Sequence, residues 1–148
     1  MVNPISKAVL LLMLVAMLGA CASAPSGRAG KAAADPELRA IERWNLLIAG
    51  QAEKAYDYLS PGRRDAETRE VYAQRMNNRP VRWEEAIFMS KACEQPDTCR
   101  VTIQLNINVP LPGMGGASPS LSFSQETWVR ARNGQWYYLG PAQSKEPE

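Results

Sequence analysis

Residues 101–109 carry the sequence Val-Thr-Ile-Gln-Leu-Asn-Ile-Asn-Val, in which apolar and polar side chains alternate without a break. Successive side chains of a β-strand point to opposite faces of a sheet, so this stretch predicts a strand with one apolar and one polar face. Such a strand is typical of an antiparallel sheet with one face on the core and the other in water. It is the clearest secondary-structure signal in the chain.

Three other strands are predicted around this one. The change in apolar phase between Phe123 and Trp128 predicts a bulge in the third strand. Asn133-Gly134 predicts a tight hairpin before the fourth strand. The connection 110–119, rich in glycine and proline, is predicted to be irregular. The four predicted strands cover residues 81–93, 101–109, 121–132 and 135–139.

Helices are predicted before the strands. Asp35-Pro36-Glu37 is a strong helix start, with a capping acceptor, a proline in the first turn and an acid beside it. Second and third helices are expected over 52–59 and 67–76, and Ser60-Pro61-Gly62 is expected to end the second one. The side chains expected to face the core are Leu38, Ile41, Trp44, Leu47, Ile48, Ala52, Ala55, Tyr56, Leu59, Val71, Tyr72 and Met76.

Helices followed by a four-stranded meander predict an α+β domain, with N-terminal helices packed on one face of a bent antiparallel sheet. The stretches 44–50 and 55–61 and the ending 126–139 resemble the nuclear transport factor two-like superfamily of cone-shaped domains. Many members begin with a helix, a small-residue break and a Tyr-Leu-Ser-Pro stop, and end with an Asn/Asp-Gly turn and a tryptophan strand. This resemblance implies a pocket between sheet and helices.

The N-terminus is predicted to be an export signal. Lys7 supplies a positive charge, and residues 8–18 form an uncharged apolar run. This run is too short to cross a bilayer, which takes roughly 20 residues, but it fits the apolar region of a signal peptide.

Leu18-Gly19-Ala20-Cys21 follows directly and resembles the lipobox of bacterial lipoproteins. The resemblance implies cleavage before Cys21, acylation of its thiol and new amino group, and a durable membrane anchor without a spanning helix. Ala22, in place of an aspartate, favours the outer membrane by analogy with enterobacterial sorting. The alternative is an ordinary secretory signal cut near residues 22–24. Domains are therefore expected at 1–20 (signal peptide), 21–34 (flexible tether), 35–140 (cone-shaped α+β domain) and 141–148 (disordered tail).

The remaining cysteines, Cys93 and Cys99, are an even pair in a compartment expected to be oxidising, which predicts a disulfide. Pro96 and Asp97 between them suit the tip of a hairpin joining the first two strands. A reactive redox pair is the alternative, but the spacing is not Cys-x-x-Cys.

The composition excludes several functions. The chain has no histidine, so neither a histidine-based triad nor a histidine general base exists. Three separated cysteines do not have the usual zinc spacing, and no metal or cofactor is expected. A net charge of +2, from charges of mixed sign, does not favour nucleic acid.

No residue is assigned a catalytic role. Carboxylates near aromatic residues (Asp57, Glu84, Glu85 and Glu126) could act as bases in an apolar pocket, but we interpret them as solvated charge on the outer face. Seven aromatic residues could line a ligand cavity, although such residues are more often core. They are Trp44, Tyr56, Tyr72, Trp83, Trp128, Trp136 and Tyr138.

The sequence therefore predicts a membrane-anchored periplasmic lipoprotein acting as a non-enzymatic binding or interaction module, whose partner it does not name. One alternative is a small-molecule enzyme or lipid-pocket protein of the same fold. Another is a subunit of an envelope complex, docking through the polar sheet face. A buried carboxylate facing a cavity would favour an enzyme, whereas a filled core would favour the binding module.

Overall fold

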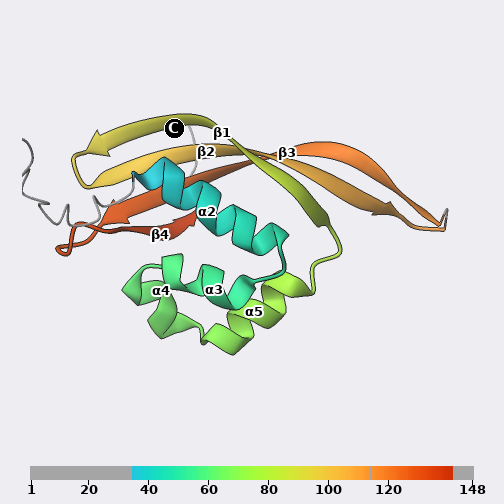
Figure 1. Cartoon of the computed structure of the whole chain (residues 1–148), viewed down its shortest axis with the longest axis horizontal. Coiled ribbons are helices and arrows are strands. Elements are labelled where there is room, and N and C mark those ends of the chain that lie inside the picture. Colours follow the sequence, from blue (N-terminus) through green and yellow to red (C-terminus); the bar gives the residue numbers. More distant parts are fainter. Residues whose placement is uncertain (1–34, 114, 142–148) are drawn as a thin grey trace, which may run out of the picture. The chain divides into compact units, whose positions relative to one another are not determined.

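A computed structural model describes residues 35–113 and 115–141 (Figure 1). Helices come first and strands second, as the sequence predicts. The helical elements are α2 (Pro36–Ile48), α3 (Ala52–Ala55), the 3-10 turn η1 (Tyr56–Tyr58), α4 (Pro61–Ala66) and α5 (Arg69–Asn77). The strands are β1 (Arg82–Gln95), β2 (Thr98–Leu111), β3 (Gly116–Arg130) and β4 (Trp136–Pro141).

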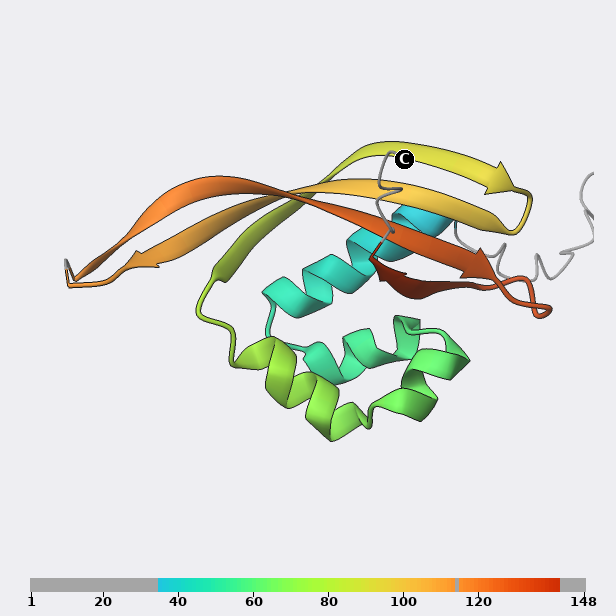
Figure 2. The same ribbon diagram turned by 180° about the vertical axis from the view of Figure 1, so that it is seen from behind.

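The four strands form one antiparallel sheet in the order β1-β2-β3-β4. All the described helices lie on one face of this bent sheet, and no described helix covers the other face (Figures 1 and 2). The predicted α+β class, with N-terminal helices on a four-stranded antiparallel sheet, is confirmed. Among the described residues, no helix is long and apolar enough to span a bilayer.

The alternation of residues 101–109 sets the two faces of the sheet. Val101, Ile103 and Leu105 of β2 are buried against the helices, while Thr102 and Gln104 between them are half-buried on the opposite face. We call the helix-covered side the inner face and the other side the outer face.

The predicted bulge in the third strand is wrong in its placement. β3 pairs with β2 in one unbroken register from Gly116 to Val129, and the irregularity lies at Leu139 of β4, opposite Thr127 and Trp128. The apolar phase of β3 changes for another reason. Phe123 points to the outer face and Trp128 to the inner face, so both sides of one regular strand carry apolar residues.

The connection 110–119 is also more regular than predicted. β2 continues to Leu111 and β3 begins at Gly116, and Gly113 and Gly115 adopt positive φ angles in the short turn between them. Pro110 is tolerated within a strand because β1 pairs with β2 only as far as Asn108, so one side of β2 is an edge there.

The helices depart from the predicted pattern in two places. The buried side of α2 runs through Ala40, Arg43, Trp44 and Leu47, so it is rotated from the apolar stripe and leaves Leu38 57% exposed. The predicted and observed faces differ because the buried face includes Arg43, and a pattern of apolar residues does not reveal a buried arginine.

The second departure from the predicted helices lies within residues 60–71. Pro61 stands at the start of α4, where its missing N–H costs nothing, so it opens a helix that the sequence reasoning treated as a break. In α5 the buried residues are Tyr72 and Ala73, which leaves Val71 exposed against the prediction.

Candidate functional site

The one acidic side chain in the described core is Glu126, on the inner face of β3, and it is 1% exposed. Its position follows from strand alternation: Trp128, two residues on, is fully buried, and the β2 partner of Glu126 is the buried Val101. The interpretation of Glu126 as solvated charge is therefore wrong. It sits beneath α2, between the helices and the sheet.

Three N–H donors converge on this carboxylate. The Arg43 Nη1 donates to Oε1 at 2.8 Å, and the Trp44 indole Nε1 donates to the same oxygen at 2.9 Å. The Trp128 indole Nε1 donates to Oε2 at 3.0 Å. Both carboxylate oxygens are thus occupied by short, charge-assisted hydrogen bonds. We call Arg43, Trp44, Glu126 and Trp128 the buried clamp.

Arg43 is as deeply buried as its partner, with a side chain 3% exposed. Its guanidinium carbon lies 4.0 Å from the centre of the Tyr138 ring, and its Nη2 donates to the Tyr72 hydroxyl at 3.5 Å. Burial alone would lower the pKa of Arg43, but the charge of Glu126 and the nearby tyrosines outweigh it, and the pKa is raised. The arginine therefore stays charged beside its carboxylate.

The clamp is electrically balanced, because it pairs one positive and one negative side chain that are 3% and 1% exposed. One polar atom of Arg43, its Nε, has no partner among the described residues. A general base needs a lone pair that can reach a substrate proton. Oε1 accepts two hydrogen bonds and Oε2 one, and the remaining lone pair of Oε2 is buried in the core, because Glu126 is 1% exposed.

Glu126 does not line any of four hollows bordered by the described residues. Two, of about 350 and 360 Å³, both border Trp83 and share Arg79 and Val81. The first is also lined by Leu47 and other apolar residues. Arg79 stacks on Trp83, with its guanidinium carbon 5.2 Å from the ring centre.

The predicted ligand-lining aromatics separate into two groups. Trp83 is partly buried and borders the two hollows. The other six lie in the core, bordering none of the four hollows: Trp44, Tyr56, Tyr72, Trp128, Trp136 and Tyr138. Whether a ligand contacts any of these residues stays a prediction.

The other three carboxylates considered from the sequence are exposed, as expected. Asp57 pairs with Arg69 at 2.6 Å, and Glu84 and Glu85 accept hydrogen bonds from asparagines of β2. No cluster of His, Cys, Asp or Glu among residues 35–113 and 115–141 is suited to hold a metal ion.

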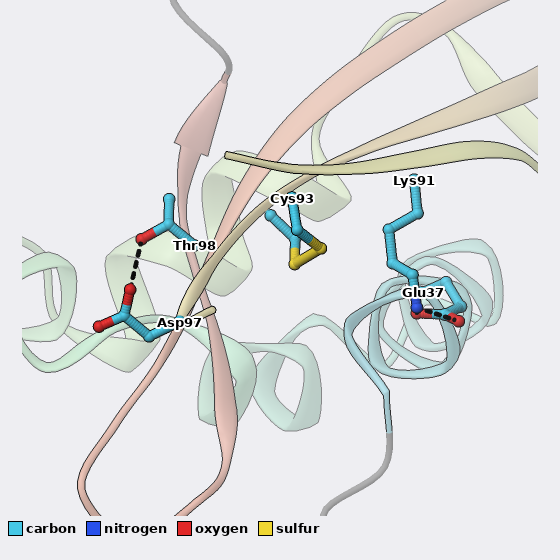
Figure 3. Close-up of a disulfide and its surroundings, with 6 residues drawn as sticks. Glu37, Lys91, Cys93, Asp97 and Thr98 are labelled. Carbon is cyan, nitrogen blue, oxygen red and sulfur yellow. Dashed lines mark hydrogen bonds and ion pairs between the residues drawn. A yellow bond between two sulfur atoms is a disulfide. The ribbon is translucent and has the colours of Figure 1, made fainter. Parts of the chain in front are cut away.

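The predicted disulfide is present. Cys93 of β1 and Cys99 of β2 are direct cross-strand partners, and their bond closes the hairpin whose turn contains Pro96 and Asp97 (Figure 3). Cys99 is 2% exposed and belongs to the core, whereas Cys93 is exposed, so the bond links the core to the surface of β1. Cys21, the predicted lipidation site, lies outside the described residues.

The outer face carries an apolar group that sequence reasoning missed. Ile87, Leu121 and Phe123 are 37, 60 and 61% exposed. Phe123 and Ile87 both lie opposite Gln104, which places them with it on the outer face. The alternation of Leu121 and Phe123 with Ser122 and Ser124 lies within the predicted third strand and could have revealed this face.

No model of a known protein family matches the chain, and neither does the sequence of any curated protein. Solved structures do resemble it. A Sec-C motif-containing protein from Psychrobacter arcticus superposes with a TM-score of 0.55 at 14% identity, over 78% of this chain and 64% of that one.

Two further structures have TM-scores of 0.44. One is an NTF2-like protein with a cystatin-like fold from Novosphingobium aromaticivorans, 15% identical over 94% of this chain and 87% of that chain. The other is a putative ketosteroid isomerase from Shewanella frigidimarina, 9% identical over 69% and 88%. At such identities a likeness extends to the fold alone, and scores below 0.5 carry no argument.

Proposed function

We propose that this chain is a non-enzymatic interaction module of nuclear transport factor two-like architecture, tethered to a bacterial membrane through lipidated Cys21 and facing the periplasm. The lipobox-like Leu18-Gly19-Ala20-Cys21 supports the tether, and Ala22 favours the outer membrane. The order of helices and strands supports the architecture.

The observation that carries the non-enzymatic part is the state of Glu126. In a chain without histidine, a carboxylate that faces a cavity would be the most direct candidate for a general base. The one carboxylate in the described core instead binds three core N–H groups and borders no described hollow. Its role is to join α2 to β3.

The outer face is the surface best suited to a partner. No helix among residues 35–113 and 115–141 covers it (Figure 1), and Ile87, Leu121 and Phe123 expose apolar area among the neutral side chains of Gln104 and Asn106. Exposed apolar groups with a polar surround are typical of interaction sites.

Photo-crosslinking in intact cells tests this function. A benzoyl-phenylalanine at position 123 should give a discrete protein adduct, because Phe123 lies on the proposed contact surface. The matched control is the same probe at Val71, which is 53% exposed but lies on α5. Equal adducts at both positions, or none at 123, would contradict the proposal.

A second candidate function is binding of a small apolar molecule beside Trp83. The hollow of about 350 Å³ supports it, because Leu47, Ile48 and Met76 contribute apolar contacts and Arg79 and Arg82 contribute two cations that could hold a carboxylate. A long-chain fatty acid such as oleate matches this chemistry. Titrating oleate should give a saturable change in tryptophan fluorescence that Trp83→Phe reduces. A change that does not saturate would count against this candidate.

A further inference from the structure

One edge of β3 is open over most of its length. β2 pairs with one side of β3 throughout, but β4 covers the other side only from Glu126 to Arg130. Residues 116–125 therefore have no strand partner on that side among the described residues, and together with β2 they form the long arm that extends past the helices (Figure 2). Backbone N–H and C=O groups at such an edge are a template for another strand.

Apart from Pro119, this edge lacks the usual protection against pairing. Natural edges are blocked by charged side chains, prolines or bulges. The chain has no Asp, Glu, Lys or Arg between Val101 and Gln125, and the β2–β3 register contains no bulge. Pro119 is the only blocking residue along the open edge, and it lies toward the tip.

The side chains of the open edge divide by face. Leu121 and Phe123, on the outer face, are the two most exposed large apolar residues of the described chain. The alternating residues Ser120, Ser122 and Ser124 lie on the inner side, opposite Ile107, Leu105 and Ile103 respectively. The edge thus offers apolar contacts on one face and small hydroxyls on the other.

We infer that two copies of this chain join through these edges, antiparallel, with a two-fold axis at Ser122. In this register Leu121 of each copy stands opposite Phe123 of the other, and Ser120 stands opposite Ser124. Pro119 falls at the margin of the paired stretch. The inference rests on the proposed function, because it names the partner of the same outer surface.

A second copy fits this edge because antiparallel pairing about a two-fold axis is self-complementary: the same donors and acceptors meet their own copies. An aliphatic side chain opposite an aromatic one stabilises such a pair. Like charges would oppose self-pairing at a two-fold axis, and none stands between 101 and 125. A strand from a different protein could carry opposite charges, so its binding would not require a neutral edge.

Single cysteines test the register in the full-length chain, expressed and oxidised in cells. With Ser122→Cys, the two thiols face each other at the axis and should form a covalent dimer. With Ser120→Cys, they stand four residues apart, about 13 Å along the strands, so dimer yield should be on the order of tenfold lower. Co-expressing Ser120→Cys with Ser124→Cys should restore it.

The parent chain is the baseline for these measurements, because its native cysteines are the same in every variant. Equal dimer yields for Ser122→Cys and Ser120→Cys, or no dimer above the parent, would overturn the inference.

A charge exchange gives a second test that does not depend on thiols. Leu121→Glu and Phe123→Lys, each alone, should lose self-association as measured by co-purification of differently tagged copies. Co-expressed, they should regain it, because Glu at 121 then faces Lys at 123 of the other copy. Both positions are exposed, so folding should be kept. If the two co-expressed variants did not regain self-association, the proposed register would be contradicted.

These outcomes separate the inference from the proposed function. A Phe123 photoadduct with a different envelope protein, without a Ser122→Cys dimer, overturns self-pairing and leaves the interaction module standing. A Ser122→Cys dimer together with a Phe123 adduct of twice the chain mass supports both. Absence of both products overturns both.

Discussion

At the scale of single residues, we expect the buried ion pair between Glu126 and Arg43 to matter most for the free energy of unfolding. Glu126→Gln would leave the arginine charged and buried without its counter-ion, which costs about 3–5 kcal/mol of unfolding free energy in comparable cases. Urea unfolding should show a loss of this order.

The matched control is Asp57→Asn, which breaks an exposed ion pair with Arg69 and should cost less than about 1 kcal/mol. If both substitutions had the same small effect, the clamp would contribute little to stability.

A second residue-scale prediction concerns pH. The hydrogen bonds from Arg75, at 2.8 Å each, hold the pKa of Glu67 below its ordinary value of 4.5, and Arg69 likewise lowers the pKa of Asp57. A lowered folded-state pKa stabilises the fold above the ordinary value, and this contribution is lost as pH falls through the folded value.

The urea midpoint should therefore fall between about pH 6 and about pH 3. The drop should be smaller in Glu67→Gln, which has no carboxylate to protonate. An equal drop in parent and variant would show that other groups govern acid unfolding.

The burial of Glu126 could have been inferred from its spacing to Trp128, because residues two apart in a strand share a face. The inference failed because Leu121 and Phe123 are apolar in the opposite phase, so β3 alone does not reveal which face is the core. The burial of Arg43 could not be predicted for a similar reason. A pattern of apolar residues cannot register an arginine whose charge is neutralised by a residue 83 positions away.

At the scale of elements, prediction succeeded where the local signal was strong. The alternation of 101–109 appears in β2, and α2 begins at Pro36 as predicted, although the Asp35 side chain makes no capping hydrogen bond. Asn133 and Gly134 lie in the turn between β3 and β4, and Gly134 has a positive φ, but this connection spans 131–135 and is longer than the predicted tight hairpin. α4 was missed because Pro61 can either end one helix or begin another, and only the neighbouring chain decides which.

The Cys93–Cys99 bond gives an element-scale prediction. It closes a short hairpin, so the chain-entropy estimate for its removal is about 2 kcal/mol. The Cys93→Ser/Cys99→Ser double variant should lose stability of that order in urea unfolding. The non-reduced parent should have no titratable thiol from this pair.

Reducing agent should bring the parent to the level of the double variant and leave the variant unchanged. A double variant as stable as the parent would show that the β1–β2 hairpin is held by its backbone pairing and core contacts alone.

At the scale of the whole molecule, fold class followed from the order of periodicities, helical before residue 80 and strand-like after it. The interior between the layers could not be predicted in the same way. Whether it holds a cavity or a filled core depends on which large side chains meet across the layers, as Trp44, Trp128 and Tyr138 do around the clamp.

The location of the molecule rests on Cys21, which gives the last prediction. A diacylglycerol thioether can form only on a thiol, and each buried methylene adds about 0.8 kcal/mol of membrane affinity. Metabolic labelling with a fatty-acid analogue should therefore mark the native chain, and the chain should sediment with membranes.

Cys21→Ser should be unlabelled and released, while the Cys93→Ser/Cys99→Ser variant should still be labelled, because its anchor is intact. This control separates loss of the acceptor thiol from loss of any cysteine. Equal labelling of the native chain and Cys21→Ser would refute the anchor. The folded domain would then need another reason to be placed at a membrane.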